Sequence, residues 1–312
     1  MDDLEAKLDS AQQHGNHIVA VVAVVGSTEE GAVDPVDRIL DLRASRRGQG
    51  KGSFWVHADG AYGGYLRTMT VPERMGLGPA HAEVRVSGQV RTVPIVLPEP
   101  KICAALERLG ECDSIAIDPH KLGFIPYPAG AVCFKSNLVK PIVRQEAPYL
   151  DDAASDVNAE RRSEGIGMYI LEGSKPGAAA AAVWLSHTLI PLDNSGHGLL
   201  IQESVRNACE LHALVEGFPL WAPQQTLRAE CLCPPASNIV CFAFTPARGG
   251  SSLRHINRVN RRVYARFTME PGERVYDRSF FVSRTTLLPS QYAAETVSGF
   301  LDRLGVTRAE YE

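Results

Sequence analysis

The chain has 312 residues, of which 45% are hydrophobic and 22% charged, as in an ordinary soluble globular protein of one large or two modest domains. A formal net charge of -4 provides no basic field, which argues against nucleic acid as the main partner. No apolar run reaches about 18 residues, so no membrane-spanning helix is expected. The acidic residues 1–15 lack the pattern of a secretory signal.

Cysteine usage indicates the compartment. The seven cysteines show no repeated CxxC spacing, which favours reduced thiols and a cytoplasmic location. Cys231 and Cys233 could bind a metal together, but two buried or loop thiols are the favoured interpretation, and no metal site is predicted.

The first elements alternate between helix and strand. Residues 3–14 have helical spacing, and the β-branched run 17–27 predicts a strand that is buried on both sides. Residues 34–46 form a second predicted helix, which begins at the Asp34-Pro35 pair. A second strand is predicted in residues 53–64, where it runs into a turn.

A Pro-rich, irregular stretch leads to a short predicted helix at 102–112, a third strand at 114–117 and another at 130–135. This strand–helix–strand order predicts an α/β layer fold with a mostly parallel sheet. Residues 144–167 are polar, with few apolar anchors, and predict a mobile loop or a surface crossing. A long helical tract follows, from Pro176 to about Glu216.

The last part of the chain predicts a small α+β piece. A strand is expected within residues 230–246, a helix at 252–267, a further strand at 278–290 and a final helix at 291–305.

Three polar motifs stand at predicted strand ends: GST at 26–28, HADGAYGG at 57–64 and DPHK at 118–121. Because the carboxyl ends of parallel strands share one edge of a sheet, we expect these motifs to converge there.

The side chains in these motifs suit a flat, anionic, electron-accepting cofactor. Ser27 and Thr28 offer hydroxyl donors, and Ala61 leaves room for a ring. Asp59 offers a carboxylate in an apolar strand, where burial needs a cation or a protonated ring as partner. Lys121 offers an amine that forms an imine once desolvation or a nearby cation makes it reactive. This pair is the usual protein contribution to pyridoxal phosphate chemistry.

Each residue also has a plain structural interpretation. Asp59 could cap a turn, Lys121 could be a solvated surface charge, and His57 and His120 could be hydrogen-bonded core histidines, an interpretation we favour for His57. No single residue carries the assignment, but their shared strand context strengthens it.

The chain resembles the group II pyridoxal-phosphate-dependent amino-acid decarboxylases of fold type I, with the closest likeness to bacterial tyrosine decarboxylases. The stretches that carry the resemblance are VVGSTEEGAVDPVDRI, FWVHADGAYGGYLRT, SIAIDPHKLGFIPYPAGAV, YILEGSKPGAAAAAVWLSHTLIPL and FFVSRTTLLPSQY. They cover most of the chain in the right order. The resemblance implies the C-terminal part of a cofactor-binding large domain at residues 1–190 and a small C-terminal domain at 191–312.

The resemblance also assigns roles to residues. It implies that Lys121 binds pyridoxal 5'-phosphate covalently and that Asp59 pairs with the ring nitrogen of the cofactor. His120 would lie by the phosphate and the lysine, and Ala61 would pack on the ring. Ser27 and Thr28 would lie near the cofactor or the substrate carboxylate.

The implied reaction is decarboxylation of an L-amino acid to the amine and CO2, with tyrosine or another aromatic amino acid as the first expectation and glutamate as the next. Family members place a proton-donating tyrosine on a mobile loop, and Tyr149 is the candidate here; a surface aromatic is its alternative. Tyr127 would line the substrate pocket or pack in its loop. Lys175 and Arg284 are candidates for binding the substrate carboxylate, with a helix cap and an internal salt bridge as their alternatives.

Family members carry roughly as much chain again before the position that matches Met1. That part supplies the side chain that stacks on the cofactor ring and a Ser/Thr phosphate-binding turn. We therefore expect a homodimer or a complementing chain with the front half, and an aggregation-prone sheet edge in its absence. A fragment is an open alternative, as are a non-catalytic half-decarboxylase that acts as a binding or regulatory partner and a carbon–carbon lyase on the same scaffold.

Overall fold

The computed structural model of the chain describes residues 1–86, 88–95, 98, 100–145, 166–170, 172, 175–217, 226–247 and 252–312. These residues form two compact units, each assembled from separate parts of the sequence. Unit 1 comprises residues 1–25, 34–74 and 103–199, and unit 2 comprises residues 26–33, 75–102 and 200–312. The predicted division between residues 190 and 191 stays a prediction.

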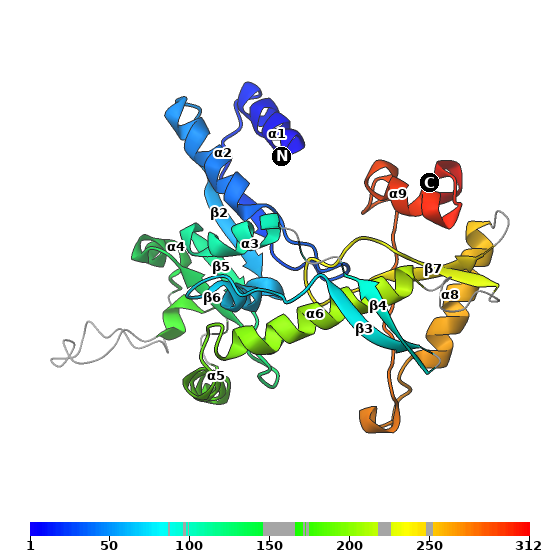
Figure 1. Ribbon diagram of the computed structural model, residues 1–312. Coiled ribbons are helices and arrows are strands. Elements are labelled where there is room, and N and C mark those ends of the chain that lie inside the picture. Colours follow the sequence, from blue (N-terminus) through cyan, green and yellow to red (C-terminus); the bar gives the residue numbers. More distant parts are fainter. Residues whose placement is uncertain are drawn as a thin grey trace. The chain divides into compact units, whose positions relative to one another are not determined.

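Helices and strands alternate from residue 2 to residue 60, as the sequence predicts (Figure 1). In chain order the elements up to the middle of the chain are α1 (Asp2–Gln13), β1 (Ala20–Val24), α2 (Val36–Gly48), β2 (Trp55–Gly60), η1 (Gly63–Thr70), β3 (His81–Val86), β4 (Gln89–Pro94), α3 (Pro100–Glu107), η2 (Leu109–Glu111), β5 (Ser114–Ile117) and β6 (Ala131–Phe134). The later elements are η3 (Asn137–Val139), α4 (Lys140–Val143), η6 (Ile166–Tyr169), α5 (Gly177–Leu189), α6 (His197–Glu216), β7 (Leu227–Cys231), β8 (Phe242–Pro246), α8 (Leu253–Phe267), η7 (Val275–Asp277), α9 (Ala294–Leu304) and α10 (Arg308–Tyr311).

Unit 1 is built around a four-stranded sheet of order β1-β2-β5-β6. β1 and β5 both run parallel to β2, and β6 is antiparallel to β5. The fold is therefore α/β with a mostly parallel sheet, which confirms the predicted class. The central strand β2 alternates between buried and half-buried residues, with Val56 and Ala58 completely buried.

Helix α2 follows β1 and lies next to β2 because its apolar residues share one face. Val36, Ile39 and Leu40 are buried at a spacing of three and four residues, which is the period of a helix. Asp34, two residues before the helix, ties the connecting segment to β1, because its carboxylate accepts a hydrogen bond of 2.7 Å from the backbone N–H of Val24 at the end of that strand.

The expectation that the first strand is buried on both sides is wrong for this chain. In β1, Val22 is 56% exposed while Ala23 is completely buried, so only one face of the strand is covered within unit 1. The continuous apolar run could not reveal this, because it fits a covered strand as well as a strand with one apolar face open.

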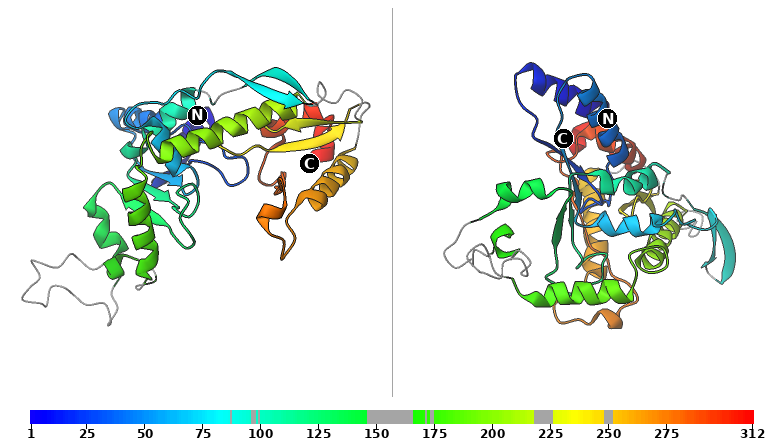
Figure 2. Two further views of the ribbon diagram at one scale, coloured as in Figure 1. Left: turned by 60° about the horizontal axis from the view of Figure 1, so that its bottom comes forward. Right: turned by 90° about the vertical axis from the view of Figure 1, so that its left-hand side faces the viewer.

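Unit 2 contains two antiparallel hairpins, β3–β4 and β7–β8. The β3–β4 hairpin occupies the stretch that the sequence predicts to be irregular, and it forms the cyan pair of arrows in Figure 2. The strand predicted at 278–290 is also wrong: the structure places no strand there, and its backbone bond from Val282 N–H to the Phe267 carbonyl joins it to the end of α8 instead.

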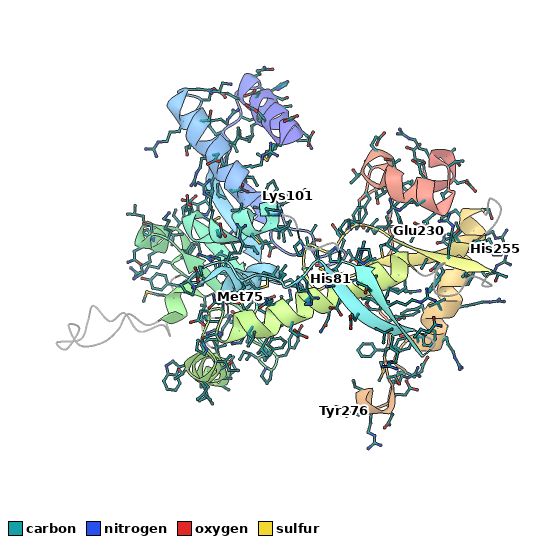
Figure 3. The ribbon with its side chains drawn as sticks, viewed as in Figure 1. Met75, His81, Lys101, Glu230, His255 and Tyr276 are labelled. Carbon is teal, nitrogen blue, oxygen red and sulfur yellow. The ribbon has the colours of Figure 1, made fainter. Side chains whose placement is uncertain are left out.

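The core of unit 2 lies around α9. Its buried residues Val297, Phe300, Leu301 and Leu304 repeat at helical spacing and pack in one cluster with Ile256 of α8. By contrast, η7 projects into solvent, where Tyr276 is 97% exposed (Figure 3). Within the described chain, no helix combines the length and the apolar character needed to cross a membrane.

Candidate active site

The candidate site lies where strands β2 and β5 of unit 1 end. These strands are parallel neighbours, with Asp59 opposite Ala116 and Gly60 opposite Ile117. Beyond the ladder, the N–H of Asp118 donates a hydrogen bond of 3.1 Å to the carbonyl of Ala61. The segments that follow the two strands are therefore held side by side, as the convergence argument predicts for the second and third motifs.

Asp59 lies at this edge with a half-buried side chain. Its Oδ1 accepts a hydrogen bond of 3.2 Å from the N–H of Ala61, so the carboxylate also shapes the turn after β2. In the strand register Val22, His57 and Asp59 share one face of the sheet, because side chains alternate along each strand. This is the face on which Val22 is exposed.

Lys121 stands in a tight turn after β5. Its backbone N–H donates to the Asp118 carbonyl at 2.9 Å, and its Nζ lies 2.9 Å from Oδ2 of the same residue. The lysine side chain is 32% exposed, so its amine is accessible at the sheet edge. Sequence reasoning missed Asp118 as the partner of this amine, although the residue is the first of the DPHK motif.

His120 is held against the loop that follows Lys121. Its Nδ1 contacts the carbonyl of Ala129, and its Nε2 lies 3.7 Å from Oδ2 of Asp118. The ring of Tyr127 packs on the imidazole, with the ring centroids 3.8 Å apart. His120 thus lies between the Asp118 carboxylate and the Tyr127 ring, and Tyr127 is 74% exposed.

The GST motif at residues 26–28 takes part in a local turn. Ser27 and Thr28 belong to unit 2, in the short segment 26–33. The Ser27 hydroxyl accepts a hydrogen bond of 2.9 Å from the N–H of Ala32, so it closes a local turn. Thr28 is exposed. A cofactor role for either residue stays a prediction.

The remaining candidates have structural partners or lie outside the described residues. Lys175 Nζ lies 3.2 Å from Glu172, and Arg284 stacks over the ring of Tyr264 at 5.0 Å from its centroid. Tyr149 falls in the range 146–165, outside the residues that the structure describes.

A buried aromatic cluster supports the Lys121 turn, and sequence reasoning missed it. The Tyr65 hydroxyl lies 2.9 Å from Nε2 of His187, and the Tyr65 ring is 5.5 Å from that of His197. A Cβ added to Gly123 would lie 2.6 Å from the Tyr65 ring, so the turn packs directly on this cluster. Burial raises the pKa of Tyr65 to about 12, which keeps the phenol protonated.

The donor set at the sheet edge fits the reactive end of pyridoxal phosphate. An accessible amine suits bonding to an aldehyde, and a half-buried carboxylate on the adjacent strand suits a protonated ring nitrogen. Without a cofactor, the Lys121 amine and the Asp59 carboxylate would make only ordinary contacts at the protein surface.

Comparison with known proteins identifies decarboxylases as relatives of this chain. Residues 208–312 match the family model described as tyrosine decarboxylase, C-terminal. The chain is 33% identical to the L-tyrosine decarboxylase of Enterococcus faecium over 297 residues, which are 95% of this chain and 47% of that protein. It is 31% identical to the L-tyrosine decarboxylase of Levilactobacillus brevis, covering 94% of this chain and 46% of the relative.

Solved structures show the same fold at lower identity. Mouse CSAD in its apo form matches with a TM-score of 0.54 and 22% identity, over 85% of this chain and 46% of that one. Oryza sativa TDC, solved with PLP and tryptamine, matches with a TM-score of 0.53 and 19% identity, over 84% of this chain and 44% of that one. The chain spans about half the length of the curated relatives it matches, with 47% of the first. By sequence it belongs with the tyrosine decarboxylases, and it corresponds to their C-terminal half.

Proposed function

We propose that this chain is the C-terminal half of a pyridoxal-phosphate-dependent decarboxylase that converts an aromatic L-amino acid, tyrosine first, to the amine and CO2. The observation that carries the proposal is the placement of Asp59 near the end of β2 and of Lys121 in the turn after β5, the parallel neighbour of β2, in a chain that is 33% identical to an L-tyrosine decarboxylase. Seven free cysteines support the cytoplasmic location that belongs to the same proposal.

Each residue of the site has a part in this reaction. When bound, pyridoxal phosphate supplies an aldehyde that combines with amines and a ring that accepts electrons. Lys121 would bind the cofactor through its amine at the strand edge, and the Asp59 carboxylate would stabilise a protonated ring nitrogen. Ala61 leaves space beside the ring, and His120 orients the lysine through their shared partner Asp118.

Tyr149 is the proposed donor of the proton that replaces the carboxylate on the substrate. A phenol, with an ordinary pKa of about 10, is protonated at neutral pH and can act as a general acid once water is excluded. Tyr127, exposed beside His120, is proposed to line the substrate pocket.

A front half, on the same or on a separate chain, completes the proposed site. The open face of the unit 1 sheet supports this step, because Val22 of β1 and Val132 of β6 are 56% and 57% exposed. A sheet face of this kind is normally covered in α/β proteins. The relatives, about twice as long, have the additional chain to cover it. A homodimer of the completed protein is part of the proposal.

The test uses the chain with its front half, found by reading the DNA immediately upstream. After addition of cofactor and borohydride reduction, peptide mass spectrometry should find the cofactor mass on Lys121, and tyrosine should yield tyramine and CO2. Lys121→Arg keeps the charge and should abolish both results. Lys51→Arg, at a lysine that pairs with Asp9 and has no part in the proposed site, should leave both unchanged.

The outcomes separate the competing functions. An adduct without amine or CO2 from any aromatic amino acid would favour another reaction on this scaffold. No adduct on Lys121, in the chain alone and with the front half, would show a non-catalytic protein and overturn the proposal.

A further inference from the structure

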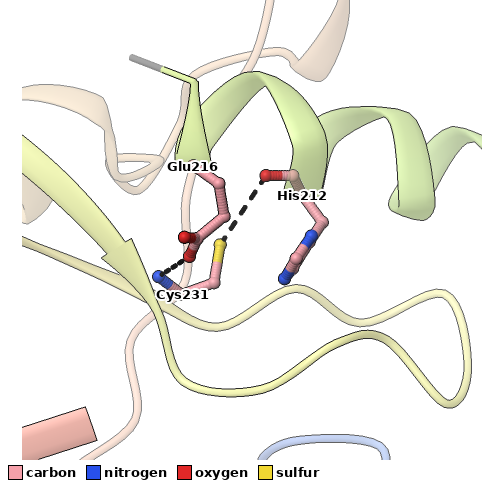
Figure 4. A group of neighbouring side chains, drawn as sticks. All are labelled: His212, Glu216 and Cys231. Atoms are coloured by element: carbon pink, nitrogen blue, oxygen red, sulfur yellow. Dashed lines mark hydrogen bonds between the residues drawn. The ribbon is translucent and has the colours of Figure 1, made fainter. Parts of the chain in front are cut away.

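Three side chains of unit 2 that bear lone pairs converge at the end of helix α6 (Figure 4). His212 and Glu216 are four residues apart on this helix and so lie on the same face, and Cys231 is the last residue of strand β7. One ligand atom from each, a ring nitrogen, a carboxylate oxygen and the Sγ, lie within 4.8 Å of one another. None of the three belongs to the proposed decarboxylase site.

The cluster is built into the unit from the inside. His212 is 7% exposed and Cys231 is 1% exposed, whereas Glu216 closes the cluster from the solvent side. The backbone N–H of Cys231 donates a hydrogen bond of 2.8 Å to Oε1 of Glu216, which holds the carboxylate over the buried pair. The three groups are thus positioned by a helix and a strand rather than by loops.

The hydrogen bonds of the cluster leave one buried group without a partner. Nδ1 of His212 is buried and makes no hydrogen bond, and the Cys231 thiol lies 4.0 Å from the His212 carbonyl and interacts with the Glu216 carboxylate. A buried polar atom without a partner is energetically costly, so such atoms are rare in native proteins. The cluster therefore brings an imidazole nitrogen, a carboxylate and a thiol close to one another.

We propose that His212, Glu216 and Cys231 bind a zinc ion. Imidazole, thiolate and carboxylate are the three ligand types of Zn²⁺ in proteins, and the thiolate disfavours Mg²⁺ and Ca²⁺. The charges balance, because a thiolate and a carboxylate neutralise the divalent ion. The nearby cation Arg303 is already paired with Glu230 at 3.3 Å and donates to the Cys231 carbonyl at 2.6 Å.

Zinc binding requires the three ligand atoms to move only slightly closer together. Zinc bond lengths of about 2.0–2.3 Å place tetrahedral ligands about 3.3–3.7 Å apart. The present separations, within 4.8 Å, reach this by side-chain rotation. Water on the exposed side of Glu216 supplies the fourth ligand. Burial raises the pKa of the Cys231 thiol, so zinc binding releases its proton to solvent as the Zn–S bond forms. The ion would clamp the last turn of α6 to β7 and stabilise unit 2.

The experiment titrates the metal-stripped 312-residue chain with Co²⁺, which reports a thiolate ligand by a charge-transfer absorption band. We expect one equivalent of Co²⁺ to produce this band and one equivalent of Zn²⁺ to remove it. Zn²⁺ should also raise the thermal midpoint in a concentration-dependent way. A folded chain that shows no thiolate band contradicts the proposal.

Variants test two of the three ligands separately. Cys231→Ser should abolish the band, and Glu216→Gln should weaken Zn²⁺ binding at least about 10-fold while keeping an acceptor for the Cys231 N–H. Cys209→Ser, a buried thiol on the same helix, and Cys233→Ser, an exposed thiol after β7, should both leave the band unchanged. Unchanged Zn²⁺ affinity in Glu216→Gln, or loss of the band in Cys233→Ser, would overturn the assignment of ligands.

Discussion

At Gly123, two residues after Lys121, the chain leaves no space for a side chain. A Cβ there would lie 2.6 Å from both the Pro119 carbonyl oxygen and the Tyr65 ring. The backbone of the Lys121 turn and the buried phenol are both fixed, so neither can yield cheaply. The position of the lysine at the sheet edge therefore depends on a residue that does no chemistry.

We expect Gly123→Ala to destabilise the chain by about 1–3 kcal/mol, the usual effect of forcing extra volume into a packed region. Gly110→Ala is the matched control, because a Cβ at Gly110 meets nothing within 4 Å. Urea denaturation followed by circular dichroism measures both variants. Equal midpoints for the two variants would show that the turn can move away from Tyr65.

Asp118 shows what sequence reasoning could and could not find at this scale. The motif itself predicts that Asp59, His120 and Lys121 gather at strand ends, and the structure holds the segments that carry them side by side. The pairing of Asp118 with the lysine amine was not predicted, because it depends on the backbone turn that brings residue 118 back to residue 121. A linear spacing of three residues does not specify that turn.

Between elements, the first residue of α6 meets η1 and α5 in a cluster of rings. His197 is completely buried, neither of its ring nitrogens has a hydrogen-bond partner, and its ring lies 5.7 Å from that of His187. Burial, with a smaller contribution from His187, lowers the pKa of His197 below its ordinary value. The imidazole must therefore stay neutral for these elements to remain packed.

This arrangement predicts an acid-sensitive fold. Below pH about 6.5 the unfolded chain binds a proton at His197 that the folded chain does not, so the free energy of unfolding falls as the pH is lowered. We expect His197→Phe to flatten this dependence by up to about 1.4 kcal/mol per pH unit between pH 6.5 and 5. Exposed His17 provides the control, and His17→Phe should retain the wild-type slope in urea titrations. An unchanged slope in His197→Phe would contradict the prediction.

The secondary structure was predictable wherever the pattern was local. The helical spacing of Val36, Ile39 and Leu40 and the Asp34-Pro35 start identify α2. The β3–β4 hairpin was missed because its strands are flanked by prolines and carry many exposed residues, a pattern that is typical of a loop. The predicted strand at 278–290 failed for the opposite reason: its β-branched and aromatic residues fit a strand, but no strand among the described residues pairs with it.

At the scale of the whole molecule, unit 1 leaves several large apolar side chains exposed. Unit 1 exposes Val22 on the sheet face that also carries Asp59, and it exposes Trp184 and Leu189 of α5 to 69% and 71%. Exposed apolar side chains of this size tend to associate with other chains. The amino-acid pattern shows that such residues are apolar, but only the folded unit shows which of them remain uncovered.

If a front half covers this face, a charge placed there should block the assembly without unfolding the chain. We expect Val22→Lys to reduce recovery of the front half in co-purification at least about 10-fold, because burying an unpaired ammonium costs several kcal/mol. Val90→Lys in β4 is a matched control, since Val90 is 55% exposed against 56% for Val22 and also lies in a strand. Circular dichroism should show both variants folded. Equal recovery with the two variants would mean that the front half binds elsewhere, and the open face beside Asp59 would then need a different partner.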